Sequence, residues 1–191
     1  MIELKKLKVL YAEDEETTRG SMCRILNKFF GDVIDVEDGQ VGLETFKTLL
    51  NDGTPPDVII SDINMPKMNG LDMVKGIREL DKEIPIVLLT AHSEANYLLE
   101  AISLHVSEYV IKPMNMTVLF EKLQSAYLPI HQKKLLEIQN IELAQLNKKI
   151  KEVAKQELED MQEKLIGYDY IDSDEGIDFD ALIDNINLDN I

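Results

Sequence analysis

The chain has 191 residues and a formal net charge of −16, and hydrophobic residues make up 45% of it. This length suggests one domain, or one domain plus an appendage, with enough apolar side chains for a sizeable core. The acidic balance argues against sequence-independent binding to nucleic acid and against docking on an anionic membrane, because both require clustered Lys and Arg.

Residues 1–128 alternate between strand-like and helix-like segments. Short apolar runs predict strands near residues 8–12, 33–36, 57–61, 85–89 and 108–111. Segments with helical spacing follow them, near residues 17–30, 40–50, 70–80, 94–104 and 115–127. Alternation at this spacing predicts βαβ units and a parallel sheet. The strands are continuous apolar runs, which is typical of a sheet covered by helices on both faces, so we predict a doubly wound α/β domain.

A second region, residues 129–166, follows this domain. Pro129 is expected to end the preceding helix or to kink the chain. From His131 to Ile166 there is no Gly or Pro, and strong helix formers dominate. One apolar stripe runs along this predicted helix: Leu143, Leu146, Ile150, Ala154, Leu158, Met161 and Leu165. Because a long helix with one such stripe normally needs a partner, we predict a coiled-coil homodimer through residues 131–166. The alternative is packing on its own domain or on a further downstream domain.

The last region, residues 167–191, is an acidic tail. It contains eight Asp and Glu residues and no Lys or Arg, with apolar residues interleaved. Residues 180–188 have the pattern of one short amphipathic helix, and such segments often fold only on a partner.

Cysteine content and hydropathy bear on localisation. Cys23 is the single cysteine, which rules out an intramolecular disulfide framework and fits a reducing compartment. The N-terminus, MIELKKLKVL, is too charged for a signal peptide, and no apolar run approaches the roughly 20 residues that span a bilayer. We therefore expect a cytoplasmic protein.

Polar residues follow four of the five predicted strands. Glu13 and Asp14 come after the first strand, Asp62 after the third, Thr90 after the fourth and Lys112 after the fifth. The carboxyl ends of parallel strands share one edge of the sheet, where ligands bind. We therefore expect these scattered side chains to converge in space.

The chemistry of the acidic residues suggests a cation and a phosphoryl group. Three carboxylates that meet repel one another, and a divalent cation relieves the repulsion; ligation by oxygen alone favours Mg²⁺. A carboxylate such as Asp62 can also attack a phosphoryl group to form an aspartyl phosphate. Taken singly, Asp62 could be a solvated loop residue, and Glu13 and Asp14 could favour a helix N-terminus, as Glu15 and Glu16 are expected to do.

The other two strand ends supply donors. Lys112 offers a positive charge to a phosphoryl oxygen or to Asp62, and Thr90 offers a hydroxyl, although a lone Thr at a strand end is usually structural. The Lys112–Pro113 bond is a candidate for the cis form, which most X-Pro bonds do not adopt.

Four segments carry a family resemblance: KVLYAEDEE, PDVIISDINMPKMNG, IPIVLLTAHS and SEYVIKP, in this order within about residues 6–128. Together they resemble the response-regulator receiver domain of two-component signalling, as found in chemotaxis regulators. The resemblance implies a flavodoxin-like, five-stranded parallel sheet of order 2-1-3-4-5. It also implies a phosphoacceptor signalling protein rather than an enzyme.

The resemblance implies that Asp62 is the phosphoacceptor. It implies that Glu13, Asp14, Asp62 and the backbone carbonyl of Asn64 hold Mg²⁺. Glu13 departs from the family, which often has Asp there.

The resemblance also implies which residues transmit the signal and which set the lifetime of the phosphoryl group. Thr90 and Tyr109 are the implied switch pair, and Lys112 is the implied phosphate-contacting residue. Asn64 and His92 are implied to flank the path of the hydrolytic water and to tune the lifetime of the phosphoryl group. For His92 the alternative is an exposed loop or helix-start position.

The implied function is signalling by phosphotransfer. A phosphohistidine on a sensor kinase or phosphotransfer protein donates to Asp62, and the face formed by residues 94–104, 108–111 and 115–127 changes shape. No DNA-binding or catalytic output motif fits in residues 129–191, so output is expected through binding of a protein target. The alternative is the N-terminal receiver and linker portion of a larger signalling enzyme, a cyclase or kinase. A phosphatase is disfavoured, because Asn64 stands where such enzymes need a second carboxylate.

The tail carries a second, shorter resemblance. Asp180-Ala181-Leu182-Ile183 is similar to part of the short peptide of the flagellar switch protein that chemotaxis receivers bind. This implies docking of the tail on a receiver face, with a solubilising acidic end as the alternative.

Overall fold

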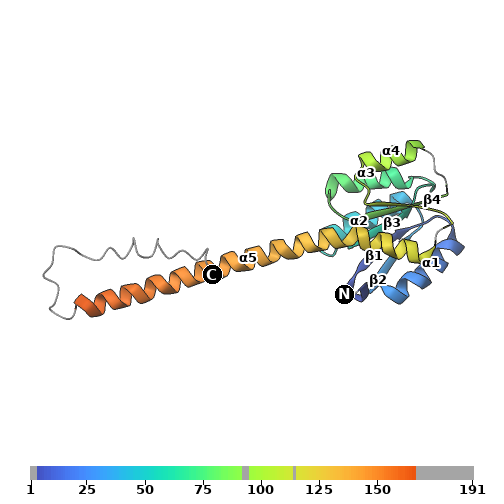
Figure 1. Ribbon diagram of the computed structural model, residues 1–191. Helices are drawn as coiled ribbons and strands as arrows, with labels where there is room; N and C mark the ends of the chain where they lie inside the picture. The colour runs from blue at the N-terminus through green and yellow to red at the C-terminus, as the bar shows by residue number, and fades with distance from the viewer. Residues whose placement is uncertain (1–3, 92–94, 114, 167–191) are drawn as a thin grey trace. The chain divides into compact units, whose positions relative to one another are not determined.

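The computed structural model describes residues 4–91, 95–113 and 115–166. His92 and the acidic tail therefore lie outside the described residues. The elements, labelled in Figure 1, are η1 Leu4–Lys6, β1 Lys8–Ala12, α1 Glu16–Phe29, β2 Asp32–Val36, α2 Gly39–Asn51, β3 Val58–Asp62, α3 Gly70–Leu80, β4 Ile86–Thr90, α4 Ala95–Ser103, β5 Glu108–Ile111 and α5 Met116–Ile166. The chain divides into two compact units, residues 1–132 and 133–191.

The first unit contains a five-stranded sheet of order β2-β1-β3-β4-β5 in which every pairing is parallel. The expected strand order is therefore confirmed. In the ladder, Ala12 lies opposite Ser61, Asp62 opposite Leu89 and Thr90 opposite Ile111. This register brings the carboxyl ends of β1, β3, β4 and β5 to nearly the same level, which places the predicted site residues along one edge.

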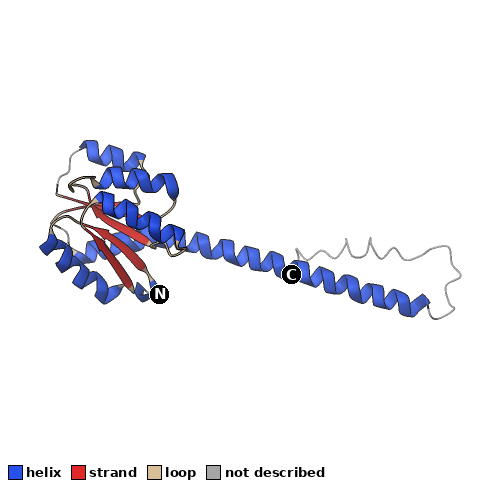
Figure 2. Ribbon diagram, turned by 180° about the vertical axis from the view of Figure 1, so that it is seen from behind, coloured by secondary structure: helices blue, strands red, loops and turns tan. Residues whose placement is uncertain are grey.

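The sheet lies between two layers of helices, as Figures 1 and 2 show. Side chains alternate along each strand, so Tyr11 packs under α1 and α5 while Leu10 packs under α2, α3 and α4. The central strands β3 and β4 are buried along their whole length, as expected when both faces are covered. Burial of apolar surface on both faces is the main stabilising contribution in such a sandwich.

Side-chain caps fix where three helices begin. Glu15 caps α1 by accepting hydrogen bonds from the backbone amides of Thr17 and Thr18, as its position before the helix predicted. Asp38 caps α2, and Asn69 caps α3. Since each cap lies in a loop at the site edge, the same side chains that start the helices also order those loops.

The last helix differs from one sequence-based expectation. The sequence predicts that Pro129 ends the fifth helix or kinks the chain; since Pro129 lies inside α5, the first of these alternatives is wrong. Proline removes one backbone donor, but the strong helix formers from His131 onward let the helix continue, because extending a helix costs much less than nucleating one. Residues 133–166 of α5 belong to the second unit, where Leu143, Leu146, Ile150 and Met161 of the apolar stripe are between 41% and 56% exposed.

The length and hydropathy of the helices bear on membrane insertion. Within the described ranges, none has the combination of length and hydropathy needed to pass through a bilayer.

Candidate functional site

Three carboxylates gather at the carboxyl edge of the sheet. Glu13 and Asp14 follow β1, Asp62 ends β3, and one oxygen of each lies within 4.8 Å of the others. Glu13 and Asp62 are buried, at 2% and 8% exposure, whereas Asp14 is exposed and opens the cluster to solvent. An all-oxygen donor set with one open side fits a hard divalent cation that keeps several of its waters. The acidic cluster is thus consistent with the expected Mg²⁺ site.

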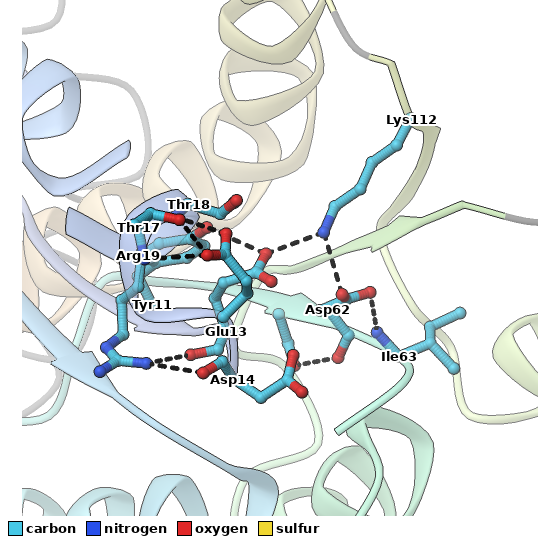
Figure 3. A network of polar contacts seen from close by, with 11 residues as sticks. Tyr11, Glu13, Asp14, Thr17, Thr18, Arg19, Asp62, Ile63 and Lys112 are labelled. Atoms are coloured by element: carbon cyan, nitrogen blue, oxygen red, sulfur yellow. Dashed lines mark hydrogen bonds and ion pairs between the residues drawn. The ribbon is translucent and has the colours of Figure 1, made fainter. Parts of the chain in front are cut away.

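Lys112 bridges two of these carboxylates, as Figure 3 shows. Its Nζ donates to Glu13 Oε2 at 2.8 Å and to Asp62 Oδ2 at 2.9 Å. Burial works against the charged ammonium, but the hydrogen bonds and charges of Glu13 and Asp62 outweigh it and raise the pKa of Lys112. The lysine therefore stays protonated and offsets part of the negative charge. The Lys112–Pro113 peptide bond is cis.

Asp62 is held by the backbone that follows it. Its Oδ1 accepts a hydrogen bond from the amide of Ile63 at 2.7 Å, while Oδ2 contacts Lys112. The loop after β3 then turns back, and the amide of Gly70 donates to the carbonyl of Ile63 at 2.8 Å. A Cβ at position 70 would lie 2.1 Å from the carbonyl oxygen of Asp62, so only glycine fits this approach. Asn64, within this loop, is exposed.

Glu13 has a second partner below the site. The Tyr11 hydroxyl donates to Glu13 Oε2 at 3.3 Å, and Tyr11 is completely buried. Burial, followed by the negative charge of Glu13, raises the pKa of Tyr11, which keeps the hydroxyl protonated as a donor. Sequence reasoning missed this residue, although its spacing of two from Glu13 puts both side chains on one face of the strand.

Arg19 was also missed. It lies in α1, and its guanidinium reaches back to the backbone carbonyls of Glu13 and Asp14. The signal that could have found it is a basic residue one turn into the helix that directly follows the acidic pair.

The remaining predicted residues lie on β4 and β5. Thr90 is completely buried at the end of β4, and its carbonyl accepts a hydrogen bond from the amide of Lys112 at 2.6 Å. Tyr109 lies on the adjacent strand opposite Leu88 and packs, partly buried, against the core under α4. The structure thus brings Glu13, Asp14, Asp62 and Lys112 into direct proximity, with Thr90 and Tyr109 on the neighbouring strands.

A five-stranded parallel sandwich with paired acids, a strand-end aspartate and a lysine at one edge defines an acidic phosphoacceptor pocket. In agreement, residues 9–124 match the family described as the response regulator receiver domain. The chain belongs to this family and is a CheY-like receiver of two-component signalling. Such receivers are typically non-enzymatic phosphoacceptors, and a receiver domain implies a histidine kinase as partner.

Individual relatives agree with this assignment. The chain is 35% identical to the chemotaxis protein CheY1 of Helicobacter pylori over 121 residues, which cover 62% of this chain and 94% of that protein. The N-terminal domain of an uncharacterized protein from Wolinella succinogenes is 32% identical, with a TM-score of 0.58, and the match covers 69% of this chain and 98% of that one. A fusion carrying the trimeric coiled coil of yeast Spc42 is 27% identical, with a TM-score of 0.60, and the match covers 78% and 99%.

Proposed function

We propose that this protein is a response regulator that accepts a phosphoryl group on Asp62 from a phosphohistidine of a sensor kinase or phosphotransfer protein. In this step the P–N bond of the donor breaks, a bond forms between phosphorus and a carboxylate oxygen, and the imidazole leaves. The observation that carries the proposal is the bridge from Lys112 to Asp62 beside two further carboxylates. Lys112 would contact a phosphoryl oxygen after transfer, as its ammonium already faces the acceptor.

Mg²⁺ is the proposed cofactor. Glu13, Asp14, Asp62 and the backbone carbonyl of Asn64 would hold it, directly or through water. When bound, the ion neutralises charge on the oxygens of the transferring phosphoryl group. The side chain of Asn64 is exposed beside the site, which supports a role for it, together with His92, in tuning the lifetime of the phosphoryl group.

We further propose that Thr90 and Tyr109 act as the switch pair and that output occurs through the face formed by α4, β5 and α5. On α4, β5 and residues 116–132 of α5, five of the described large apolar side chains are more than 40% exposed: Leu98, Leu99, Ile102, Ile111 and Val118. Their exposure supports binding of a protein target through this face, because large exposed apolar areas usually mark interaction sites.

The second unit is proposed to form a homodimer through residues 131–166. Support comes from the exposed apolar stripe along α5. The match to the Spc42 fusion also covers 78% of the chain, compared with 62% for the chemotaxis protein from Helicobacter pylori, which indicates that this match extends past the receiver. That fusion carries a trimeric coiled coil, so a measurement of the mass in solution must distinguish two chains from three.

A second candidate function has one observation in its favour. The similar Wolinella structure is the N-terminal domain of its protein, which fits the alternative that this chain corresponds to the receiver and linker portion of a larger signalling enzyme. In either case the phosphoacceptor site and its chemistry are the same.

Phosphorylation of the full chain tests the proposal. With a small phosphodonor and Mg²⁺, intact mass spectrometry is expected to show one added phosphoryl group, which is lost in EDTA and in Asp62→Asn. Asp72→Asn, an exposed carboxylate in the first turn of α3, is the matched control and should label normally. Labelling that survives Asp62→Asn would remove Asp62 from its role.

A further inference from the structure

Arg19 makes three contacts that join α1, β2 and the loop between β1 and α1. Its Nη1 donates to the backbone carbonyl of Glu13 at 2.8 Å and to that of Asp14 at 3.2 Å. Its Nε lies 3.3 Å from Asp35 Oδ2 at the end of β2. The side chain is only 16% exposed, so these contacts are made in a partly desolvated setting. Figure 3 shows the guanidinium on the far side of Glu13 from Lys112.

These contacts bear on the direction in which the acidic side chains point. Glu13 and Asp14 follow the end of β1. The amide of Glu13 still donates to the carbonyl of Val36 at 3.1 Å, but the carbonyls of Glu13 and Asp14 are directed toward Arg19. The position of each carboxylate depends on the backbone torsions at these two residues, so a rotation there shifts the carboxylate oxygens. Nη1 alone reaches both carbonyls while Nε pairs with Asp35, so the planar guanidinium makes all three contacts at once in a fixed geometry and restricts those torsions. A flexible ammonium cannot do this equally well.

We propose that Arg19 is a positioning residue for the metal site: it fixes the backbone of Glu13 and Asp14 so that their carboxylates converge on Asp62. The inference rests on the proposed Mg²⁺ site. Arg19 acts through the backbone and does not touch the cation. Asp35 orients the guanidinium and balances its charge. Paired in this way, Arg19 repels a bound cation less than an unpaired arginine would.

A purely structural role makes a different prediction. If Arg19 only tied α1 to β2, its replacement would lower the free energy of unfolding and leave the Mg²⁺ affinity of the folded protein unchanged. The affinity itself is therefore the informative measurement, with unfolding followed separately in EDTA.

The test is Mg²⁺ titration of the full chain by isothermal calorimetry. Arg19→Lys keeps the positive charge but removes the planar guanidinium, whereas Arg19→Gln removes both the charge and the guanidinium. Each is expected to weaken Mg²⁺ binding about tenfold, the lower end of what altered outer-shell partners cost. Arg24→Lys is the matched control, because Arg24 lies on the same helix and contacts the carbonyl of Gly20 instead of the loop; its Mg²⁺ affinity should equal that of the wild type.

Three outcomes overturn the proposal: wild-type affinity in Arg19→Lys, tighter binding in Arg19→Gln, or an equal loss in Arg24→Lys. If Arg19→Lys folds poorly, Asp35→Asn decides, because it removes only the partner that orients the guanidinium. Weaker Mg²⁺ binding in Asp35→Asn supports the proposal, and unchanged affinity overturns it. Failure of the metal site itself looks different: the wild type would not bind Mg²⁺, or Asp14→Asn would bind it as tightly as the wild type.

Discussion

Lys112 and Asp62 are separated by 50 residues in the sequence, yet the ammonium of one lies 2.9 Å from the carboxylate of the other. The same ammonium lies 2.8 Å from Glu13, so one cation holds two carboxylates from two other strands. This bridge means that the acidic site is partly neutralised before any metal binds, and it yields two predictions about stability.

Lys112→Met should destabilise the protein most when metal is absent. Removing the ammonium leaves two mostly buried carboxylates facing each other, which should lower the free energy of unfolding by about 1–3 kcal/mol. Mg²⁺ should recover much of this loss, because it neutralises the same oxygens. Urea unfolding in EDTA and in Mg²⁺ measures both values.

The control for this substitution is Lys122→Met. Lys122 pairs with Glu108 at 2.9 Å, but its side chain is 42% exposed, so the expected cost is below about 1 kcal/mol and independent of Mg²⁺. An equal loss for Lys112→Met with and without Mg²⁺ would show that Mg²⁺ does not neutralise the carboxylate oxygens that Lys112 contacts.

The contribution of Lys112 should also depend on pH in a defined direction. Its pKa in the folded protein is raised above the usual 10.5, so its stabilising effect is fully present below that value and is lost as the pH rises through the folded pKa. The stability difference between the wild type and Lys112→Met, measured in EDTA by urea unfolding from neutral pH upward, should stay constant to about pH 10 and then shrink. A difference that widens on the alkaline side would show that the sign is wrong.

Gly70→Ala should impair both folding and phosphorylation. A Cβ there would lie 2.1 Å from the carbonyl oxygen of Asp62, so the backbone beside the phosphoacceptor must shift, at a cost of about 1–3 kcal/mol. Chemical unfolding and the initial rate of labelling by a small phosphodonor measure the two effects.

Gly20→Ala provides the opposite result on the same assays. Gly20 is within α1 and no atom lies within 4 Å of an added Cβ, so alanine should stabilise the protein by about 0.5–1 kcal/mol with normal labelling. If the two substitutions had similar effects, the close approach at Gly70 would not be what constrains the loop.

Ile150→Asp should reduce the oligomeric state of the full chain. It introduces a charge into the exposed apolar stripe of α5, and a buried unpaired charge at a helix interface is strongly unfavourable. Light scattering at micromolar concentration should give the mass of a homodimer for the wild type and of a monomer for the variant. Gln145→Asp, on the opposite side of the helix, should keep the wild-type mass. A monomeric wild type, with and without beryllofluoride as a phosphoryl mimic, would rule out the coiled coil.

The fold was predictable from the sequence because its strands are short apolar runs, and the four strands that carry site residues each have a polar residue at the carboxyl end. Predicted and observed strands agree within one residue, as at 57–61 against Val58–Asp62. The convergence of Glu13, Asp62 and Lys112 followed from the shared edge of parallel strands. The strand order came from the family resemblance, since local patterns do not specify which strands are neighbours.

Other features depend on contacts that no local pattern encodes. Arg19 acts through backbone carbonyls, and the identity of a side chain says nothing about a partner of that kind. The Tyr11–Glu13 contact could have been inferred because both side chains lie on the same face of the strand. A tyrosine in an apolar run is, however, first interpreted as a core residue. Continuation of α5 through Pro129 reflects cooperativity over many residues, which outweighs the local preference of one.

The bridge from Lys112 has a consequence for the order of events at the site. Three carboxylates and one ammonium leave two uncompensated negative charges, and a dianionic phosphoryl donor would be repelled on approach. A divalent cation cancels those two charges. Glu13, Asp14 and Asp62 would repel the donor less with Mg²⁺ held between them, so the cellular level of free magnesium would limit the rate at which Asp62 is phosphorylated.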